Sequence, residues 1–342
     1  MNSINLENSE DLQYCFEFNM SCPKSIRSTT TTVTMYIFIT ISIVITILGN
    51  SVVMISILHF KQLQTPTNYL VLSLAFVDFL MGFFVLPFSM VRSVETCWYF
   101  GDTFCDIHST LDVVLTTVSI YNLCFIAIDR YYAVCEPLLY SIKMTLPMTA
   151  LIITLNWLFA IIYGSCVFLS EFTKKASGHY RTTISCKGSC IEYRFGGHMD
   201  ALIVLFIPTF IILGIYLKIY FVQRKHARKI GNMPNNINSK EEINVRVLQT
   251  KEKTAAKNQG VVMGIFVLSW LPFYLSSIIN PYLNFATPPI LFEAFTWFGF
   301  FNSAFNPVLY AFFYPWFRTA LKSILTCQIL RPESSIMNLF PE

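Results

Sequence analysis

Long apolar blocks separated by short polar segments make up most of the chain. The stretches without any formal charge are 28–60, 144–170, 258–292 and 294–317. Three further blocks each carry a single acid inside an otherwise uncharged run: Asp78, Asp112 and Asp200. A helix needs about 20 apolar residues to cross a hydrocarbon core. The pattern therefore predicts seven membrane-crossing helices, at roughly 33–58, 69–91, 105–134, 145–169, 197–221, 258–280 and 290–312.

The 258–292 block is too long for one crossing, and a proline divides it. Pro281 cannot continue a helix and it restricts Asn280 before it, so the sixth helix should end there. After the seventh helix, the stretch 314–327 carries apolar side chains on one face, at Phe317, Leu321, Ile324 and Leu325. This spacing predicts a short amphipathic helix at the membrane surface. The expected fold class is an all-α membrane protein, a seven-transmembrane helix bundle with a short amphipathic eighth helix.

The same pattern divides the chain into a tail at 1–32, the bundle at 33–312, and an amphipathic helix with its tail at 313–342. Two connections in the bundle are long, at 171–196 and 222–256. The segments on one side carry 16 Lys and Arg residues and those on the other carry 8. Because Lys and Arg concentrate in cytoplasmic loops, we expect an extracellular N-terminus and a cytoplasmic C-terminus.

Composition agrees with a multi-pass membrane protein. The chain is 54% hydrophobic and 13% charged, whereas a soluble domain is about 25% charged. The net charge of +4 comes from the expected cytoplasmic face, so it gives no reason to expect a nucleic-acid partner. The partners that this composition does imply are membrane lipids.

Two acids are candidates for binding a cation within the bundle. Asp112 carries the one formal charge between Asp106 and Asp129, inside the third predicted helix. A carboxylate at membrane depth is costly and marks a candidate functional site. Asp200 begins the fifth helix, about two turns from Pro208, at a depth close to that of Asp112.

A second polar layer lies deeper in the membrane. Asp78 and Asn50 should face inward and find polar partners on later helices. The candidate partners are Ser119, Asn302 and Asn306. This layer has two readings that the spacing leaves open: a site for a small cation such as sodium, or a polar network that packs the helices together.

Three motifs mark the inner end of the third helix and proline kinks in the sixth and seventh. The motif Asp129-Arg130-Tyr131 stands where the third helix meets water. Trp270-Leu271-Pro272 puts a proline inside the sixth helix, and the seventh helix carries a second, with Asn306 and Tyr310 around Pro307. A proline within a helix removes a backbone hydrogen bond and makes a kink, so both are candidate hinges.

Six cysteines fall on the expected outer side: Cys15, Cys22, Cys97, Cys105, Cys186 and Cys190. Disulfides are plausible on that oxidising face, but sequence alone does not fix their pairing. Asn19-Met20-Ser21 is a glycosylation sequon in the expected outer tail. Cys327, at the end of the amphipathic helix, is a candidate for palmitoylation or a free thiol.

Three other classes of protein find less support. A transporter often shows internal repeats and broken helices around a midplane site, and no repeat is visible. A light receptor needs a Schiff-base lysine in the seventh helix, and the sequence has none between Glu293 and Arg318. No metal-ligand cluster or nucleophile with a base indicates an enzyme, and no cofactor is expected apart from the sodium ion.

The motifs together resemble a rhodopsin-like (class A) G-protein-coupled receptor. The matching residues, in order along the helices, are Asn50, Asp78, Cys105, Asp129-Arg130-Tyr131, Trp157, Pro208, Trp270-Leu271-Pro272 and 306–310. A closer resemblance is to the trace amine-associated receptors, a vertebrate family mostly of olfactory amine sensors. The stretches typical of them are 59–68, 92–95, 97–101, 302–303, 314–317 and the Cys186 and Cys190 pair.

This resemblance implies two disulfides, Cys105–Cys186 as the main bridge and Cys22–Cys190 from the tail to the outer loop. It also implies that Asp112 pairs with the ammonium group of a ligand. Aromatic faces around such a pair would stabilise the cation. The residues placed to form them are Trp270, Phe273, Tyr274, Trp297 and Phe300, each of which has a plain packing role as its alternative.

Three positions depart from the family pattern. Phe300 stands where members usually have a tyrosine that orients the acid of the third helix. Asn280 replaces a common aspartate, and the run 252–259 differs from the usual, more basic one.

Asp200 narrows the ligand class further. Most monoamine receptors have a hydroxyl or apolar residue at this place. Some fish members that resemble this chain carry both acids and recognise diamines. Two facing carboxylates would each prefer a cation to an unpaired buried charge. The alternative is a monoamine receptor in which Asp200 meets His198, Arg194 or outer water and does not bind ligand.

The implied mechanism is that of a plasma-membrane receptor for a heterotrimeric G protein. At rest Arg130 would pair with Asp129 and Glu252. Ligand binding would favour the state in which the sixth helix swings outward about Pro272, because a ligand shifts an equilibrium only by binding one state better. The resemblance implies a stimulatory or olfactory G protein that raises cyclic AMP. A receptor that binds without signalling is the remaining alternative.

Overall fold

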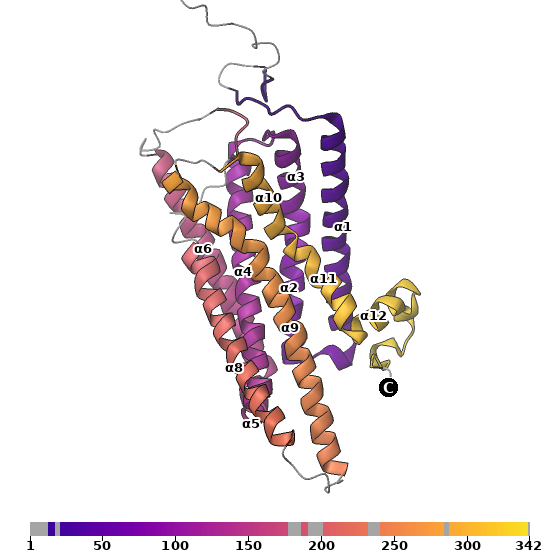
Figure 1. Cartoon of the computed structure of the whole chain (residues 1–342). Helices are drawn as coiled ribbons and strands as arrows, with labels where there is room; N and C mark the ends of the chain where they lie inside the picture. Colours follow the sequence, from indigo (N-terminus) through magenta and orange to yellow (C-terminus); the bar gives the residue numbers. More distant parts are fainter. Residues whose placement is uncertain are drawn as a thin grey trace, which may run out of the picture.

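The protein is an elongated bundle of long helices lying side by side (Figure 1). The computed structural model describes residues 13–17, 21–176, 186–190, 201–231, 240–283 and 287–340. The N-terminal tail lies at one end of the bundle and the C-terminal segment at the other (Figure 1). We call these the disulfide end (residues 13–28, 92–106 and 186–190) and the Arg130 end (residues 59–68, 130–143 and 313–340).

The long helices are α1 Thr29–His59, α2 Pro66–Leu80, α3 Leu86–Glu95, α4 Asp102–Cys135, α6 Leu146–Ala176, α8 Ile207–Gly231, α9 Lys240–Ile279, α10 Pro289–Phe300 and α11 Asn302–Phe313. The shorter ones are η1 Lys61–Leu63, η2 Met81–Val85, α5 Pro137–Lys143, η3 Ala201–Phe206, η4 Asn280–Leu283, α12 Pro315–Leu325, η5 Gln328–Leu330 and η6 Ser334–Ile336. Within the described residues, six helical stretches are long and apolar enough to cross a membrane. The seventh crossing is divided between α10 and α11, so the predicted bundle is confirmed.

Local sequence explains where several elements begin. Ser28 caps α1 by accepting a hydrogen bond from the backbone N–H of Thr31. Thr65 caps α2 in the same way, and Pro66 follows at the first helical position, where its missing N–H costs nothing. As predicted, the sixth crossing ends at Asn280, where η4 replaces the α-helix.

Two crossings contain a wide π-helical turn, and in each a proline stands two positions after the end of the turn. The segment η2 leads into α3 with Pro87 near its start, and η3 leads into α8 with Pro208. A proline ring clashes with the carbonyl one turn earlier and leaves it without a donor. A wider turn relieves that clash and rotates the face that the following helix presents to the bundle.

The expected bounds differ most at the Arg130 end. The loop expected at 222–256 is helical over much of its length, because α8 continues to Gly231 and α9 begins at Lys240. The predicted amphipathic helix is α12, which crosses beside the end of α1 (Figure 1). Large apolar side chains such as Phe210, Ile162 and Leu48 are exposed on the sides of the bundle, as contact with lipid requires.

Candidate functional site

Asp112 lies on α4, about two turns along the helix from Cys105. Its side chain is half-buried, and Thr116, one turn further along, donates a hydrogen bond to Oδ1 at 3.3 Å. The helix that carries it packs against α9 and η3. The predicted anchor is therefore inside the bundle, on a helix that touches the fifth and sixth crossings.

The five predicted aromatic residues form one continuous cluster on α9 and α10. Trp270, Phe273, Tyr274, Trp297 and Phe300 are all buried. The ring centroids of Trp270 lie 5.7 Å from Phe273 and 6.1 Å from Phe300. Phe300 meets Trp297 at 5.5 Å, and Phe273 meets Tyr274 at 5.3 Å, both edge to face. Edge-to-face contacts stabilise aromatic pairs beyond the burial of apolar area, so these rings hold one another in place as one side of the predicted site.

Contacts outside the predicted set hold this cluster in place. The indole N–H of Trp297 donates to Ser93 Oγ on α3 at 2.9 Å. Gly299 lets the Trp270 ring approach closely, because a Cβ at that position would lie 2.7 Å from a ring carbon. Phe292 extends the cluster toward the disulfide end, with its ring 5.3 Å from that of Phe273. Sequence reasoning did not assign Ser93 or Phe292 to the site, although Ser93 lies in the family-typical stretch 92–95.

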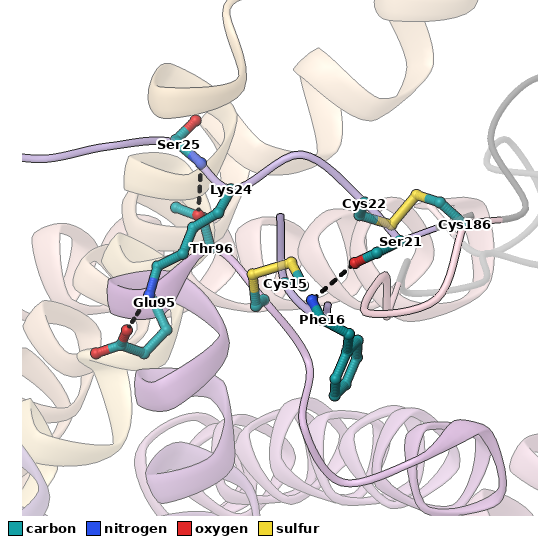
Figure 2. Close-up of a disulfide and its surroundings, with 10 residues drawn as sticks. Cys15, Phe16, Ser21, Cys22, Lys24, Ser25, Glu95, Thr96 and Cys186 are labelled. Atoms are coloured by element: carbon teal, nitrogen blue, oxygen red, sulfur yellow. Dashed lines mark hydrogen bonds and ion pairs between the residues drawn. A yellow bond between two sulfur atoms is a disulfide. The ribbon is translucent and has the colours of Figure 1, made fainter. Parts of the chain in front are cut away.

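The disulfides correct the pairing that the family resemblance implied. Cys105 at the start of α4 is bonded to Cys190, not to Cys186. The tail residue Cys22 is bonded to Cys186, not to Cys190 (Figure 2). The two cysteines are four positions apart at the same end of the molecule, so both pairings fit the sequence equally well.

The path of the short segment 186–190 decides the pairing. The backbone N–H of Cys22 donates to the carbonyl of Lys187 at 2.9 Å, which holds the beginning of the segment to the tail. The backbone N–H of Trp98 donates to the carbonyl of Gly188 at 2.8 Å, further along. The segment thus runs from the tail toward α4, and only its last cysteine reaches Cys105.

A third disulfide, Cys15–Cys97, ties the tail to the connection between α3 and α4. Gly188 lies directly against it, because a Cβ at that glycine would be 2.7 Å from the Cβ of Cys15. The φ of Gly188 is +101°, a backbone conformation that favours glycine. Both cysteines were recognised as outer residues, but no partner was assigned to either.

Two ion pairs add to the covalent links of the tail. Lys24 Nζ lies 2.7 Å from Glu95 Oε2 at the end of α3 (Figure 2). Arg27 bridges two helices, with one guanidinium nitrogen 2.8 Å from Glu293 Oε2 on α10 and another donating to the Ser93 carbonyl. The hydrogen bond to Glu95 raises the pKa of Lys24 above its ordinary value. The tail is therefore docked on α3 and α10 rather than loosely attached.

The deeper polar layer brings three crossings together. Asn306 Nδ2 donates to Asp78 Oδ2 at 2.7 Å, and Asn50 Nδ2 donates to the Ser303 carbonyl at 3.1 Å. Asp78 Oδ1 and Asn50 Oδ1 are buried with no hydrogen-bond partner among the described residues. Such acceptors suit a cation, which would neutralise the one carboxylate present.

The other predicted members of this layer are also buried. Asn302 is 3% exposed and Ser119 is 7% exposed. The contacts described for the layer join Asp78 to Asn306 and do not join it to Ser119. The arrangement fits both expected readings, a small-cation site and a packing network.

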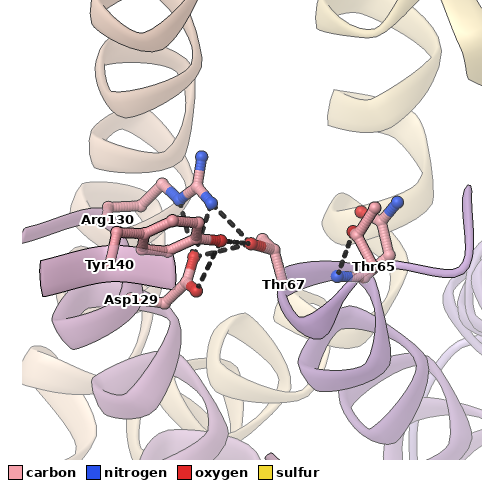
Figure 3. Close-up of polar contacts among 6 residues, drawn as sticks. Thr65, Thr67, Asp129, Arg130 and Tyr140 are labelled. Carbon is pink, nitrogen blue, oxygen red and sulfur yellow. Dashed lines mark hydrogen bonds and ion pairs between the residues drawn. The ribbon is translucent and has the colours of Figure 1, made fainter. Parts of the chain in front are cut away.

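At the Arg130 end, the predicted pair of Asp129 and Arg130 is part of a larger network (Figure 3). Arg130 Nε donates to Asp129 Oδ2 at 2.9 Å, and Asp129 is fully buried. Thr67 Oγ1 at the start of α2 donates to the same carboxylate oxygen at 2.7 Å and accepts a hydrogen bond from Arg130. The hydroxyl of Tyr140 on α5 lies 3.1 Å from Thr67 Oγ1 and 3.3 Å from Asp129 Oδ1.

Thr67 and Tyr140 were not predicted as members of the site. Thr67 is on α2, 63 residues from Arg130 in sequence, and Tyr140 is on α5, which follows α4 directly. Packing of both helices against α4 brings them to Arg130. The available signs were their polar side chains at the expected edge of the membrane and the place of Thr67 in the family-typical stretch 59–68. In this network burial raises the pKa of Tyr140 above its ordinary value.

The remaining predicted switch residues lie nearby. Tyr131 donates to Glu136 Oε1 at 3.0 Å, and Lys218 Nζ lies 4.8 Å from the centre of its ring. Pro307 is inside α11 and packs against Gly49 of α1, while Tyr310 is buried one turn further on. The Tyr310 and Tyr314 rings meet edge to face at 5.6 Å.

Three predicted residues lie outside the described part of the structure. Asp200 and Asn19 are in segments that the structure does not describe. Glu252 is in α9, but its side chain is not described. Asp200 directly precedes η3 in the sequence. The predictions for these residues stay predictions.

Comparison with known proteins identifies the class of this fold and site. A family model described as 7 transmembrane receptor (rhodopsin family) matches residues 49–310. The chain belongs to this family, whose members are receptors and not enzymes.

The chain also falls within one group of that family. It is 44% identical over 344 residues to trace amine-associated receptor 4 of Rattus norvegicus, covering 100% of this chain and 99% of that one. It is 44% identical over 331 residues to trace amine-associated receptor 13c of Danio rerio, covering 96% of each. Trace amine-associated receptor 2 of Homo sapiens is 46% identical over 318 residues, with 92% and 88% covered. The resemblance seen in the sequence is thus confirmed: this is a trace amine-associated receptor.

Proposed function

We propose that this plasma-membrane receptor detects small protonated amines outside the cell and activates a heterotrimeric G protein inside it. The disulfide end would face outward, because the Lys and Arg excess lies at the other end and disulfides form on an oxidising face. In that orientation Asn19 is placed for glycosylation. A glycosidase-sensitive mobility shift that is absent in Asn19→Gln would support both the glycan and the orientation.

One observation carries the amine proposal: a carboxylate, Asp112, inside the membrane-spanning part of α4. A charge at that depth is costly, so it marks a candidate functional site, and an acid can pair with a cation. The aromatic cluster on α9 and α10 adds polarisable faces that favour an ammonium group. The relatives' names, which refer to trace amines, agree with this ligand class.

The preferred ligand in this proposal is a diamine such as cadaverine or putrescine. Asp200 immediately precedes η3, and η3 packs against both α4 and α9. An alkyl chain with an ammonium group at each end would satisfy Asp112 and Asp200 together. If Asp200 does not bind ligand, the receptor is one for monoamines.

The signalling proposal uses the Arg130 network as the resting state. A bound amine would favour outward movement of α9 about Pro272, which lies inside that helix. Release of Arg130 would then open a site for a stimulatory or olfactory G protein, and cyclic AMP would rise. The resemblance to a family mostly of olfactory amine sensors supports an olfactory role within this proposal.

For the amine anchor, the test is a cyclic AMP dose response of Asp112→Ala at matched surface expression. Truncating one partner of a buried charge pair costs about 2–5 kcal/mol, so potency should fall at least about 30-fold. Asp102→Ala is the control, because Asp102 is an exposed acid on the first turn of the same helix. Unchanged potency in Asp112→Ala would end the amine-anchor proposal.

For the diamine, the test compares a diamine with the monoamine of equal chain length on the parent receptor and on Asp200→Ala. We expect the parent to prefer the diamine and the variant to lose that preference. Equal responses to both amines on both chains would favour the monoamine receptor instead.

We also propose that a sodium ion binds in the deeper polar layer, held by Asp78, Ser119, Asn302 and Asn306. The buried, unpartnered Asp78 Oδ1 supports this. Sodium should raise the melting temperature of the purified receptor relative to an equal concentration of N-methylglucamine, and Asp78→Asn should remove the difference. Equal melting temperatures in the two salts would leave a packing network as the role of this layer.

A further inference from the structure

The chain beyond α12 folds back onto the bundle. Cys327 ends that helix with a φ of +54°, and two short helical turns, η5 and η6, follow it. These turns bring the chain to the Arg130 end of α1 and to η1, which packs against η6 (Figure 1). We call residues 328–340 the C-terminal latch.

A buried leucine anchors the latch. Leu339 is 0% exposed and belongs to the main apolar core, and Met337 packs against that core as well. The backbone N–H of Leu339 donates to Gln62 Oε1 on η1 at 3.2 Å. By contrast Ile336 and Phe340 in the same segment are exposed, so Leu339 is the large apolar side chain of the latch that is fully buried.

A second contact joins the latch to the last turn of α1. Ser334 Oγ lies 2.7 Å from the carbonyl oxygens of Ile329 and Arg331, and its hydroxyl proton is shared between these two acceptors. Its third neighbour is Nε2 of His59, at 2.9 Å. Because the hydroxyl proton already serves the carbonyls, the imidazole donates to Oγ. Ser334 is itself 7% exposed, so this contact is enclosed by the latch.

The loop that the latch touches continues into the Arg130 network. Leu63 of η1 is buried, and Asn68 Nδ2 donates to its carbonyl at 2.8 Å. Between them Thr65 caps α2. Two residues later Thr67 contacts both Asp129 and Arg130. A brace on η1 therefore fixes the position from which Thr67 reaches the network.

We propose that the C-terminal latch is an internal brake on the receptor, which stabilises the resting Arg130 network by holding η1. Among the residues that the structure describes, the latch makes no contact with the predicted amine site, at the other end of the bundle, so it acts on the equilibrium between resting and active states and not on the amine site itself. Its release would loosen the start of α2 and weaken the hold of Thr67 on Arg130. The functional arm of the test rests on the proposed G-protein coupling, whereas the structural arm does not.

The first variant is Leu339→Asp in the full-length receptor, with Ile336→Asp as the matched control. A charge at the buried position should open the latch, whereas the exposed position should tolerate it. Ligand-free nucleotide exchange on the G protein should rise about two- to tenfold in Leu339→Asp, the population change that a lost contact brings. Amine affinity measured by direct binding should rise by no more than the same factor, because the amine binds the active state better and that state is more populated in the variant.

Hydrogen exchange provides the structural arm. Backbone amides over 61–67 should exchange faster in Leu339→Asp than in the parent or in Ile336→Asp. Unchanged exchange there would show that the latch does not brace η1. Faster exchange with unchanged basal activity would show that the brace has no control over signalling, and either result overturns the proposal.

Gln62→Ala keeps the test decisive if Leu339→Asp fails to fold. Gln62 is exposed, so its replacement removes only the acceptor for Leu339, and Lys61→Ala is the control on the same turn. Gln62→Ala alone should raise basal activity less than Leu339→Asp does. If neither Leu339→Asp nor Gln62→Ala raises basal activity, the brake proposal is overturned. A receptor that responds to no amine would count against the proposed function only, because neither readout needs a ligand.

Discussion

The two ends of the bundle are held by different kinds of interaction. At the disulfide end, three disulfides and two ion pairs join the tail, the segment 186–190 and the helices. At the Arg130 end, the described links between α1, α2, α4, α5 and the latch are hydrogen bonds and apolar packing. Disulfides exchange in minutes to hours, whereas hydrogen bonds can break and re-form within a conformational transition.

This difference suits a receptor whose ligand binds at one end and whose partner binds at the other. A site near the covalent end keeps its shape, and binding energy is not spent on ordering it. A network of exchangeable contacts at the other end lets a modest free-energy difference select a second state. Substitutions that remove contacts at one end should therefore affect stability, whereas those at the other end should affect basal activity.

The largest effect is expected from Gly188→Ala at the disulfide end. A left-handed backbone costs a residue with a Cβ about 1–2 kcal/mol, and the contact with Cys15 adds about 1–3 kcal/mol of overpacking. Thermal unfolding of the purified receptor should show this as a clear fall in melting temperature. Gly101→Ala is the control, because Gly101 has a φ of +83° but nothing within 4 Å of its Cβ position. An equal fall in both variants would mean that packing against Cys15 is unimportant.

A smaller and different effect is expected from Thr67→Val at the Arg130 end. The change removes a hydroxyl that contacts two charged groups, a loss of about 1.5–3 kcal/mol to the resting network. Basal cyclic AMP should rise at least about tenfold while surface expression stays close to that of the parent. Thr67→Ser keeps the hydroxyl and should behave like the parent. If Thr67→Val instead lowers expression with no rise in basal activity, the network serves stability alone.

The smallest effect is expected from Lys24→Met. Lys24 is partly exposed, so its pair with Glu95 should contribute less than about 1 kcal/mol. Its pKa is raised above the ordinary value of 10.5 by the hydrogen bond to Glu95, so the contribution is full below pH 10.5 and is lost as pH rises through the raised pKa. The melting temperatures of parent and variant should differ slightly at pH 8 and converge above pH 11. Lys322→Met, at an exposed position on α12, should show no such convergence.

The membrane helices could be predicted because their cause is local. Uncharged blocks near 20 residues long have few other stable arrangements in lipid, and Pro281 divides a block that is too long for one crossing. Some helices continue beyond their apolar blocks, as α9 does in beginning at Lys240. These extensions depend on packing, which the polar residues there do not indicate. The π-helical turns are an intermediate case. The sequence contains Pro87 and Pro208, but it does not show that the backbone forms a wider turn before each of them.

The sequence by itself determined the seven crossings, the acid at Asp112 and the family, because hydrophobic length and ordered motifs are properties of the chain alone. The tertiary structure decided which cysteine of the 186–190 segment meets α4, because that depends on the direction in which the segment runs. It also decided that Thr67 completes the Arg130 network and that Leu339 is buried beside Gln62. These contacts join residues distant in sequence, and only packing of the whole bundle brings their atoms within hydrogen-bonding distance.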